Sequence, residues 1–409
     1  MSKQNRKYDL VIWGASGFTG RLVAEYLLGK YGINNDLKWA VGGRNTNKLE
    51  KVMTEIGAAE IPRITADSLD KASLDAMASQ TKVICTTVGP YAKYGDELVA
   101  SCIENGTDYC DLTGEVQWMR RMIDQHHPNA KAKGVRIVHT CGFDSIPSDM
   151  GVYFLQKEAQ KQLGSACQKI SMRVKAVKGA ASGGTIASMK NISDEVKEDK
   201  SIYKILFNPY SLCPDGERQG PDKADLQKVK KDSISGSYIA PFIMATINTK
   251  VVRRSNALLE YQYGKDFLYD ESMMVGKGFN GKIKGNLVLF SLGLAMASPD
   301  SALGKVASWF LPKPGEGPDK EARENGFYKF IFFGETADGK KIQGTVKGDK
   351  DPGYGSTSKM LGEAAVSLAK DELPAVSGML TPSVAFGDKL LERLEANAGL
   401  TFEIEKSGF

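Results

Sequence analysis

The chain is poor in the residues that build metal sites and disulfide frameworks. Its 409 residues include three histidines and six cysteines, and no two cysteines form a Cys-x-x-Cys pair. The cysteine spacing fits neither a zinc site nor a set of disulfides. We therefore expect no metal centre, and we expect buried free thiols in a reduced, cytoplasmic protein.

Long apolar runs are also scarce, which argues against a membrane span. The most apolar stretch after the first strand, residues 286–297 (N-L-V-L-F-S-L-G-L-A-M-A), has about half of the roughly 20 residues that cross a bilayer. The polar start, M-S-K-Q-N-R-K, is not a signal peptide. A buried helix is our first interpretation of residues 286–297. Contact with a membrane surface or an acyl chain is the second, and it leaves peripheral membrane association open.

An excess of one charge is missing as well. The formal net charge is +5 and is spread over short patches, which does not indicate a nucleic-acid partner. A basic groove for phosphates is compatible with this balance. A length of 409 residues with 42% hydrophobic residues favours two or three globular domains. We expect a small-molecule partner, and the sequence leaves a homodimer open.

Short apolar runs alternate with stretches of helical spacing in the first third of the chain. The apolar runs cover residues 8–13, 37–41, 61–65, 82–86, 109–112 and 136–139. The helical stretches between them include residues 18–31, 48–56 and 97–104. This alternation predicts an α/β fold whose Rossmann-type, doubly wound parallel sheet is covered by helices on both faces.

The pattern changes after residue 149 and predicts a second, α+β domain of mostly antiparallel sheet. We expect a helix over 150–163, strands over 169–177, 237–250 and 257–263, and a hairpin of 327–333 with 341–347. Further helices are expected over 356–370 and 382–397, and the Pro- and Gly-rich residues 312–318 are typical of a linker. The predicted domains are 1–149, 150–350, and a helical C-terminal segment, 351–409, that packs back against the first domain.

Three glycines stand where the first predicted strand gives way to a helix, in G-A-S-G-F-T-G-R. Gly14 permits a tight turn, Gly17 lets the backbone approach a phosphate, and Gly20 lets helix and strand pack closely. The amide groups at the start of the helix suit the diphosphate of a dinucleotide. The predicted cofactor-binding residues of this turn are Gly14, Ala15, Ser16, Gly17, Phe18, Thr19 and Gly20.

The end of the second predicted strand, A-V-G-G-R-N, distinguishes between the two nicotinamide dinucleotides. NAD-binding sites place Asp or Glu there for the ribose hydroxyl. This chain has Arg44 instead, with Lys48 one helical turn further on. A guanidinium suits the 2′-phosphate in both charge and geometry. We therefore predict NADP(H) as the cofactor.

The loop after the fourth predicted strand, T-T-V-G-P-Y-A-K-Y, is expected to border the cofactor crevice. Val88, Gly89 and Pro90 are predicted to contact the cofactor. Tyr91 and Tyr94 are candidate catalytic residues, because a phenol can donate a hydrogen bond to a carbonyl and stabilise an enolate. The alternative interpretation is that one tyrosine packs in the core and the other lies at the surface.

Polar residues also follow the fifth and sixth predicted strands. Asp111 and Glu115 are candidate acids or ribose ligands, although Glu115 also fits the first turn of a helix. Asp144 and Ser145 are candidate substrate contacts, and Ser145 is the third catalytic candidate. His139 is the one histidine in a position suited to catalysis, and a structural role is favoured for it.

Together these motifs resemble those of the saccharopine dehydrogenase-like oxidoreductases. The resemblance rests on G-A-S-G-F-T-G-R, G-G-R-N, V-G-P-Y-A-K-Y-G, Y-C-D-L-T-G-E and C-G-F-D-S-I-P-S-D. The later D-P-G-Y-G-S-T-S-K-M-L-G-E and L-T-P-S-V-A-F-G-D-K-L are similar to the branch of trans-acting enoyl reductases. The resemblance implies a Rossmann NAD(P)-binding domain, a second α/β domain, and reduction of a carbon–carbon double bond conjugated to a thioester on an acyl chain.

These expectations define an NADPH-dependent oxidoreductase that reduces an enoyl thioester or a related lipid-like substrate by hydride transfer. Tyr91, Tyr94, Ser145 and Tyr354 are the candidate donors to the enolate oxygen, and residues 286–297 are candidate lining for the acyl chain. One alternative is a non-catalytic NADP-binding protein, either a redox sensor or a lipid-surface scaffold. Another is an amino-acid dehydrogenase of the saccharopine type, which a cluster of basic residues facing the crevice would favour.

Overall fold

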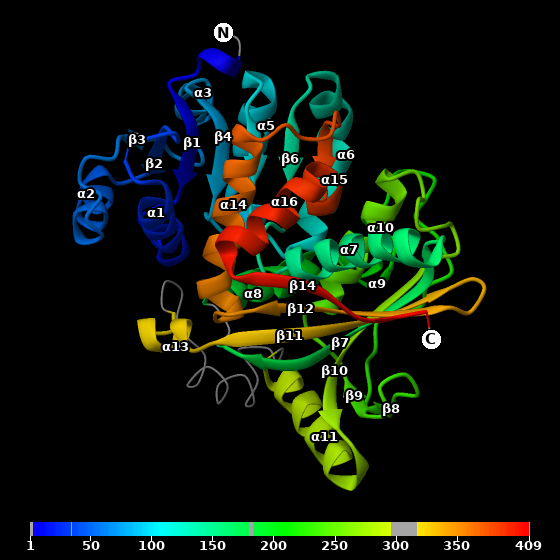
Figure 1. Cartoon of the computed structure of the whole chain (residues 1–409). Helices are drawn as coiled ribbons and strands as arrows, with labels where there is room; N and C mark the ends of the chain where they lie inside the picture. The colour runs from blue at the N-terminus through cyan, green and yellow to red at the C-terminus, as the bar shows by residue number, and fades with distance from the viewer. Residues whose placement is uncertain (1–2, 34, 180–182, 296–316, 409) are drawn as a thin grey trace. The chain divides into compact units, whose positions relative to one another are not determined.

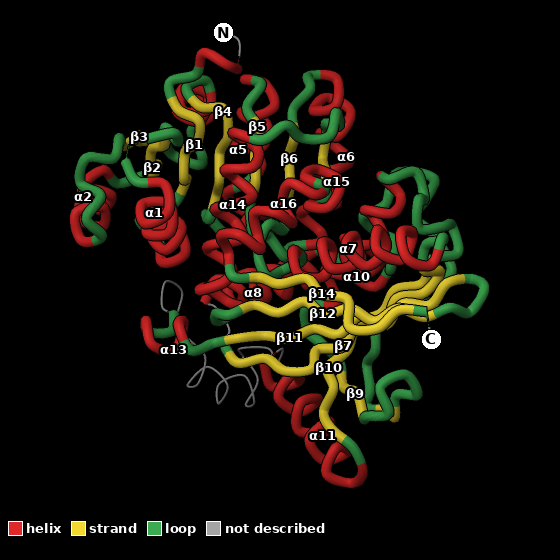
Figure 2. The backbone as a smooth tube through the Cα atoms, viewed as in Figure 1, coloured by secondary structure: helices red, strands yellow, loops and turns green. Residues whose placement is uncertain are grey.

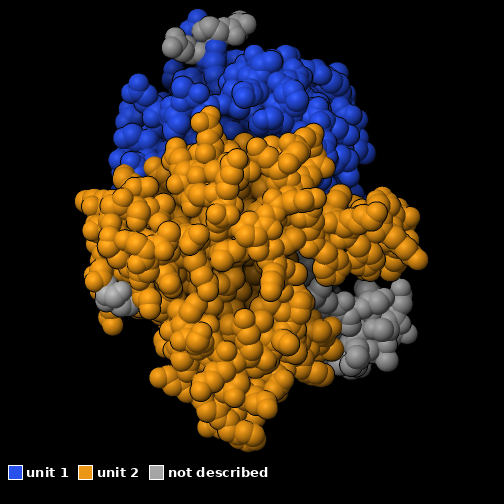
Figure 3. Space-filling view, turned by 90° about the vertical axis from the view of Figure 1, so that its right-hand side faces the viewer, with its two compact units in different colours: residues 1–146, 315–317, 353–399 blue, residues 147–314, 318–352, 400–409 orange. Residues whose placement is uncertain are grey.

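The structure is a computed structural model of the whole chain, and it describes residues 3–33, 35–179, 183–295 and 317–408. The chain forms two compact units (Figure 3). Unit 1 comprises Met1–Ile146, Gly315–Gly317 and Gly353–Gly399, and unit 2 comprises Pro147–Pro314, Pro318–Pro352 and Leu400–Phe409. Each unit is built on its own seven-stranded sheet (Figure 2).

Unit 1 contains a parallel sheet in the order β13-β6-β5-β4-β1-β2-β3. Its strands are β1 (Tyr8–Trp13), β2 (Trp39–Gly43), β3 (Arg63–Thr65), β4 (Thr81–Thr86), β5 (Asp108–Cys110), β6 (Arg136–Val138) and β13 (Gly378–Leu380). Every residue of β1 is buried, as expected for a strand with helices over both faces of its sheet. The first six strands follow the order of a Rossmann fold, in which the winding reverses between β1 and β4. The predicted fold class is confirmed.

The helices of unit 1 form two groups (Figure 1). They are α1 (Phe18–Tyr31), α2 (Thr46–Glu55), α3 (Lys71–Ala78), α4 (Tyr91–Tyr94), α5 (Asp96–Asn105), α6 (Val116–Ala132), α14 (Thr357–Lys370), α15 (Pro382–Phe386) and α16 (Asp388–Arg393), with short helical turns η1 (Lys3–Asn5), η2 (Pro352–Ser356) and η3 (Leu394–Ala398). Helices α1 and α14 pack against each other and over β1 and β4, while α3, α5 and α6 form a second layer of neighbours. The predicted helix over residues 18–31 is confirmed as α1.

A buried carboxylate joins the C-terminal helices to α1 within unit 1. Glu363 on α14 is fully buried and accepts hydrogen bonds from the hydroxyls of Tyr26 (2.5 Å) and Tyr31 (2.6 Å) on α1. The Arg393 guanidinium lies 3.1 Å from the same carboxylate and also pairs with Asp371 at 2.6 Å. Burial, followed by the nearby carboxylate, raises the pKa of both tyrosines, so both stay protonated donors.

Unit 2 contains a mixed, mostly antiparallel sheet in the order β14-β12-β11-β7-β10-β9-β8, in which β7 and β10 are parallel. Its strands are β7 (Cys167–Lys178), β8 (Lys230–Lys231), β9 (Tyr238–Ala240), β10 (Leu268–Gly276), β11 (Phe327–Thr336), β12 (Lys341–Gly348) and β14 (Leu400–Ser407). Its described helices are α7 (Ile146–Leu163), α8 (Gly183–Glu198), α9 (Ile202–Phe207), α10 (Ala245–Leu258), α11 (Gly278–Ala295) and α13 (Lys320–Glu324). The predicted hairpin is confirmed as β11 and β12.

Two predicted strands of the second domain were wrong. Residues 237–250 and 257–263 contain only the short strand β9, and helix α10 occupies most of this part of the chain. Nearly every residue of α10 is buried, and polar members are enclosed with partners: the Arg253 guanidinium pairs with Asp222 at 2.6 Å. Buried polar side chains interrupt the spacing of apolar residues at every 3.6 positions that identifies a helix. This helix was therefore not predicted from the sequence.

The C-terminal segment also differs from the expected run of helices. Residues 382–397 are divided into α15, α16 and η3, with Gly387 at a φ of 53° between the first two. Residues 378–380 form β13, and Leu400–Ser407 forms β14, which pairs with β12 of unit 2. The alternation L-T-F-E-I-E-K-S in β14 is typical of a strand and could have been recognised in the sequence. Strand β13 has only three residues, which are too few to show such a pattern.

Two further expectations concern partly described segments. Residues 312–318 lie outside the described residues except for 317 and 318. Residues 286–295 belong to α11, and 296–297 lie outside the described residues. The first interpretation of this stretch was a buried helix. It is wrong for one side of α11, where the side chains of Leu287 and Phe290 are exposed by 59% and 65%.

Candidate dinucleotide site

The predicted cofactor residues gather at the carboxyl end of the unit 1 sheet. Parallel strands present their following loops at one edge, and ligands bind where the winding reverses. In unit 1 this point lies between β1 and β4. The loops after β1 and β4 meet there, because Thr87 donates its backbone N–H to the Trp13 carbonyl at 3.0 Å.

The three glycines of the first loop have different surroundings. Gly14 has a φ of 91°, and a Cβ atom there would lie 2.6 Å from a Val88 methyl group. A Cβ on Gly20 would overlap the Gly14 carbonyl oxygen, so this glycine allows α1 to approach the end of β1. Gly17 is exposed, and its Cβ would meet only the Gly14 oxygen, at 3.3 Å. The open side of Gly17 is therefore a cradle that a methyl group would fill.

The start of α1 presents backbone donors beside this cradle. Gly17 is the N-cap residue, and no side chain caps the first turn. An uncapped helix start carries N–H groups and a positive end of the helix dipole, which together suit a phosphate. Phe18 packs its ring edge-on against Tyr354 at 4.7 Å, which fixes one flank of the turn.

Arg44 lies directly after β2, at the same edge of the sheet. Its side chain is exposed, and neither it nor exposed Lys48 has an acidic partner in the described part of the chain. Asn45 caps α2 by accepting the Lys48 amide at 2.9 Å, so the backbone around Arg44 is held in place. An unpaired guanidinium on a fixed turn can bind a phosphate monoester through two donors.

The loop after β4 is held by a buried carboxylate. Glu115 accepts the backbone N–H of Tyr91 at 2.8 Å and of Ala92 at 3.0 Å, at the start of the short helix α4. Tyr91 is itself buried, and its hydroxyl donates to the Thr86 carbonyl at 3.2 Å. Tyr94 is half-buried at the other end of α4. Sequence reasoning missed that Glu115 positions the predicted Val88-Gly89-Pro90 loop.

Asp111 links the ends of β5 and β6. Its carboxylate accepts from the Tyr109 hydroxyl at 2.8 Å and from the backbone of Thr113 and Thr140 at 3.0 and 3.1 Å. It also lies 2.7 Å from His139 Nδ1. His139 Nε2 is buried and has no hydrogen-bond partner among the described residues. The bonds that Asp111 accepts within the chain define a structural role for it.

Asp144 and Ser145 follow β6. Burial raises the pKa of Asp144 to about 7, so this carboxyl holds a proton in a substantial fraction of molecules at neutral pH. The neighbouring glycines make room for it: a Cβ on Gly142 would come within 3.1 Å of its carboxylate, and one on Gly114 within 3.5 Å. Ser145 is fully buried. Asp144 is therefore a carboxyl whose pKa lies near neutrality.

Three other features bear on the sequence expectations. All six cysteines are buried and unbridged. Among the residues that the structure describes, no group of His, Cys, Asp and Glu side chains could hold a metal ion. Within the same ranges, no helix has the length and apolar character that a membrane crossing requires.

The strand order, the glycine turn and the uncapped helix together define unit 1 as a dinucleotide-binding α/β fold, and comparison with known proteins then gives the family. The family described as the saccharopine dehydrogenase NADP binding domain matches residues 10–138. A putative trans-acting enoyl reductase of Mycobacterium tuberculosis is 40% identical, with 98% of this chain and 99% of the relative covered. A trans-acting enoyl reductase of Mycobacterium ulcerans is 35% identical, with 96% and 97% covered.

A solved structure shares the fold. The apo saccharopine dehydrogenase (L-Glu forming) of Saccharomyces cerevisiae matches with a TM-score of 0.55 at 13% identity, covering 97% of this chain and 99% of that chain. The chain therefore belongs to the saccharopine dehydrogenase-like family, and its full-length relatives are named trans-acting enoyl reductases. The resemblance read from the motifs is confirmed.

Proposed function

We propose that the protein is an NADPH-dependent oxidoreductase that reduces a carbon–carbon double bond conjugated to a thioester, on an acyl or similar lipid-like chain. The observation that supports NADPH as the cofactor is the position of Arg44 directly after β2. Its guanidinium is exposed and has no acidic partner in the described residues. The names of the full-length relatives support the enoyl substrate.

The residues of unit 1 fit this cofactor. The turn from Gly14 to Gly20 would hold the diphosphate at the start of α1, because no side chain caps that helix end and Gly17 leaves the cradle free of side-chain atoms. Arg44, with Lys48 beside it, would bind the 2′-phosphate. Residues 88–90, held against the glycine turn, would border the nicotinamide end. When bound, NADPH supplies the hydride that the reduction requires.

Asp144 is the best-suited proton donor. Reduction of an enoyl thioester adds a proton at the α-carbon, and a general acid works best when its pKa is near the working pH. A pKa of about 7 meets that condition. Tyr94 or Ser145 would donate a hydrogen bond to the thioester oxygen, and this second role suits a group that stays protonated. Tyr91 could act in the same way only if its hydroxyl left the Thr86 carbonyl.

The charge at the carboxyl end of the sheet argues against a saccharopine-type substrate. The loops after β5 and β6 carry three acids of unit 1: Asp111 and Glu115 are buried, and Asp144 is half-buried. A substrate with several carboxylates would need basic residues at this place. A thioester on an apolar chain carries no charge at the reacting group, and we assign the binding of that chain to the second predicted domain, residues 150–350.

Nucleotide titrations with one matched pair of variants test the cofactor assignment. Arg44→Ala should weaken NADPH binding about 10- to 100-fold, the value of one charge-assisted contact, and leave NADH binding nearly unchanged. Arg63→Ala is the control, because Arg63 is also exposed, lies on the adjacent strand β3 and donates to the Ala59 carbonyl at 2.8 Å. Equal losses for both nucleotides would refute the 2′-phosphate assignment.

Turnover is tested by following NADPH oxidation with a panel of enoyl thioesters of increasing chain length. We expect turnover to improve with chain length. Tight NADPH binding without turnover on any member would favour the non-catalytic NADP-binding protein instead.

A further inference from the structure

Helix α11 of unit 2 carries a row of exposed apolar side chains. Phe279, Ile283, Leu287 and Phe290 are exposed by 77%, 44%, 59% and 65%. They are separated by four, four and three residues, so at about 100° per residue they share one side of the helix. Scattered exposed apolar residues need no explanation, but a continuous row on one helix side does.

Among the described residues, this side of α11 stays largely exposed. The helix packs against β9 and β10 through its other side, where Gly281 and Gly285 are buried. A Cβ on Gly285 would lie 2.7 Å from a Val229 methyl group and 3.2 Å from Val275, so the packed side is tight. Within the described residues, much of the surface of this row therefore stays outside the packing of unit 2.

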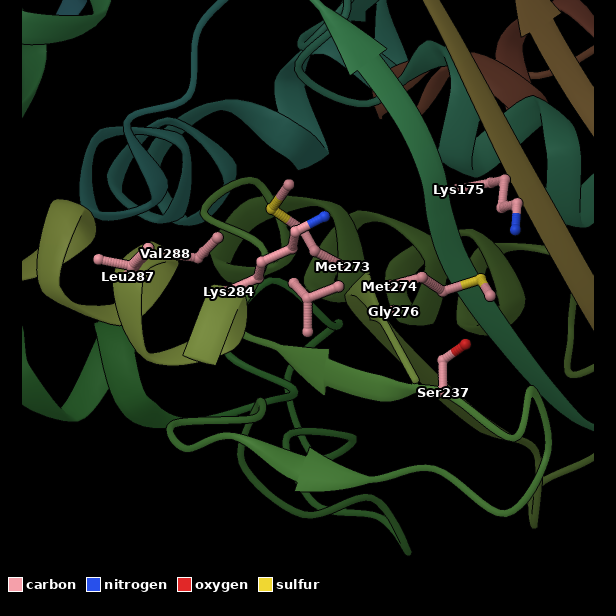
Figure 4. A pocket seen from close by; sticks show the side chains of 9 residues that line it. Lys175, Ser237, Met273, Met274, Gly276, Lys284, Leu287 and Val288 are labelled. Carbon is pink, nitrogen blue, oxygen red and sulfur yellow. The ribbon is translucent and has the colours of Figure 1, made fainter. Parts of the chain in front are cut away.

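A groove runs beside the row. Its volume is about 540 Å³, and Figure 4 shows the side chains that line it between α11, β10, β7 and the start of β9. The lining residues are Lys175, Ser237, Met273, Met274, Val275, Gly276, Lys284, Leu287 and Val288. Leu287 belongs both to the exposed row and to the groove, and Lys175 and Lys284 add two cationic side chains to its lining.

The charges around α11 have one sign. Residues 272–295 contain no Asp or Glu, and they contain Lys277, Lys282 and Lys284. These lysines and Lys175 are exposed, and none has an acidic partner in the described residues. An apolar row flanked by unpaired lysines is complementary to a surface that is apolar inside and negatively charged outside.

We propose that α11 docks unit 2 onto an anionic phospholipid membrane surface, with its apolar row in the acyl boundary and its lysines among the phosphates. No described helix can cross a membrane, so α11 would lie in the plane of the interface. A second copy of the chain is a poorer occupant. A symmetric pairing of two α11 helices would bring their lysines together without any acidic residue of the helix to compensate. The proposal does not depend on the proposed function.

Vesicle sedimentation of the full-length protein tests this proposal. We expect the protein to sediment with vesicles of phosphatidylglycerol and phosphatidylcholine, and much less with phosphatidylcholine alone. Leu287→Ser with Phe290→Ser should weaken partitioning at least about tenfold, because two apolar side chains leave the interface. Lys282→Glu with Lys284→Glu should weaken binding to the anionic vesicles by a similar factor and remove the difference between the two vesicle types.

The matched control is Leu69→Ser with Phe327→Ser, because these apolar residues are also exposed (72% and 44%) but lie outside α11. This control should bind vesicles like the wild type. NADPH affinity and the melting temperature, measured for every variant, report the integrity of the fold. The proposal is overturned if the wild type stays in the supernatant with anionic vesicles, or if the control loses as much binding as the α11 variants. It is also overturned if the apolar α11 variant binds vesicles normally while sedimentation velocity shows that it converts a dimer to a monomer.

Discussion

Three glycine-to-alanine substitutions in one turn and helix should have three different consequences. In Gly20→Ala the new methyl group would overlap the carbonyl oxygen of Gly14 and lie 2.8 Å from its carbonyl carbon. These are backbone atoms, which cannot rotate away, so α1 would have to move. Overpacking of this kind costs about 3 kcal/mol at the upper end, and alanine returns about 1 kcal/mol of helix propensity. We expect a net loss of about 2 kcal/mol.

Gly17→Ala and Gly29→Ala separate binding from stability. Gly17 has an extended φ of −83° that alanine can adopt, and its methyl group would meet only one oxygen at 3.3 Å. Stability should therefore change by less than about 1 kcal/mol, while the methyl group occupies the place of a phosphate. Gly29, in the same helix, has nothing within 4 Å of a new methyl group. Gly29→Ala should stabilise the protein by about 0.5–1 kcal/mol.

Thermal unfolding and calorimetric NADPH titration of the three variants decide the matter. Gly20→Ala should lower the Tm by about 4–8 °C, and Gly29→Ala should raise it by a few degrees without changing the affinity. Gly17→Ala should keep the Tm and lose at least about tenfold in NADPH affinity, the value of one charge-assisted hydrogen bond. An unchanged affinity in Gly17→Ala would refute the assignment of the cradle to the diphosphate. An unchanged Tm in Gly20→Ala would refute the packing argument.

Two further predictions concern buried carboxylates. The pKa of Asp144 is raised in the folded state, so the wild type loses stability as pH rises from about 4 towards 8. Asp144→Asn should therefore raise the free energy of unfolding by about 1–4 kcal/mol near pH 8, with a higher Tm, and leave both unchanged near pH 4. The same variant should lower enoyl turnover about 10²- to 10⁴-fold; a pH-independent Tm difference would contradict the buried-carboxyl argument. Arg393→Met should cost about 3–5 kcal/mol in urea unfolding because it removes the guanidinium that faces the buried Glu363 carboxylate, and adding Glu363→Gln should recover part of that loss. No recovery in the double variant would contradict this pairing.

The sequence was most informative where one local signal determines the structure. Helix α1 begins and ends where its spacing predicts, because the glycine turn fixes its start and Gly32 stands directly after its end. The parallel sheet followed from short apolar runs at regular intervals. By contrast, α10 was missed because its polar residues are buried with partners that are distant in sequence, such as Asp222 for Arg253. The period of a helix is visible only when one of its sides faces water.

The functional site divides in the same way. The diphosphate position depends on the backbone conformation of one turn, and the spacing of the glycines predicts that conformation. The special character of Asp144 depends on the loop after β5 lying beside it, and the sequence contains no sign of that proximity. The hydroxyl of Tyr91, placed by its motif beside the crevice, donates instead to the Thr86 carbonyl within its own loop.

Helix α11 illustrates why composition alone could not decide between a buried helix and a lipid contact. Its apolar residues are distributed around the helix, and such helices are usually enclosed on all sides. Here β9 and β10 cover only the glycine-containing side, and the opposite side carries the exposed row and is flanked by lysines. The two proposals also fail independently. Every residue assigned to the nucleotide lies in unit 1, whereas α11 lies in unit 2. A protein that bound NADPH but not anionic vesicles would lose only the membrane proposal, and one that bound vesicles but not NADPH would lose only the oxidoreductase.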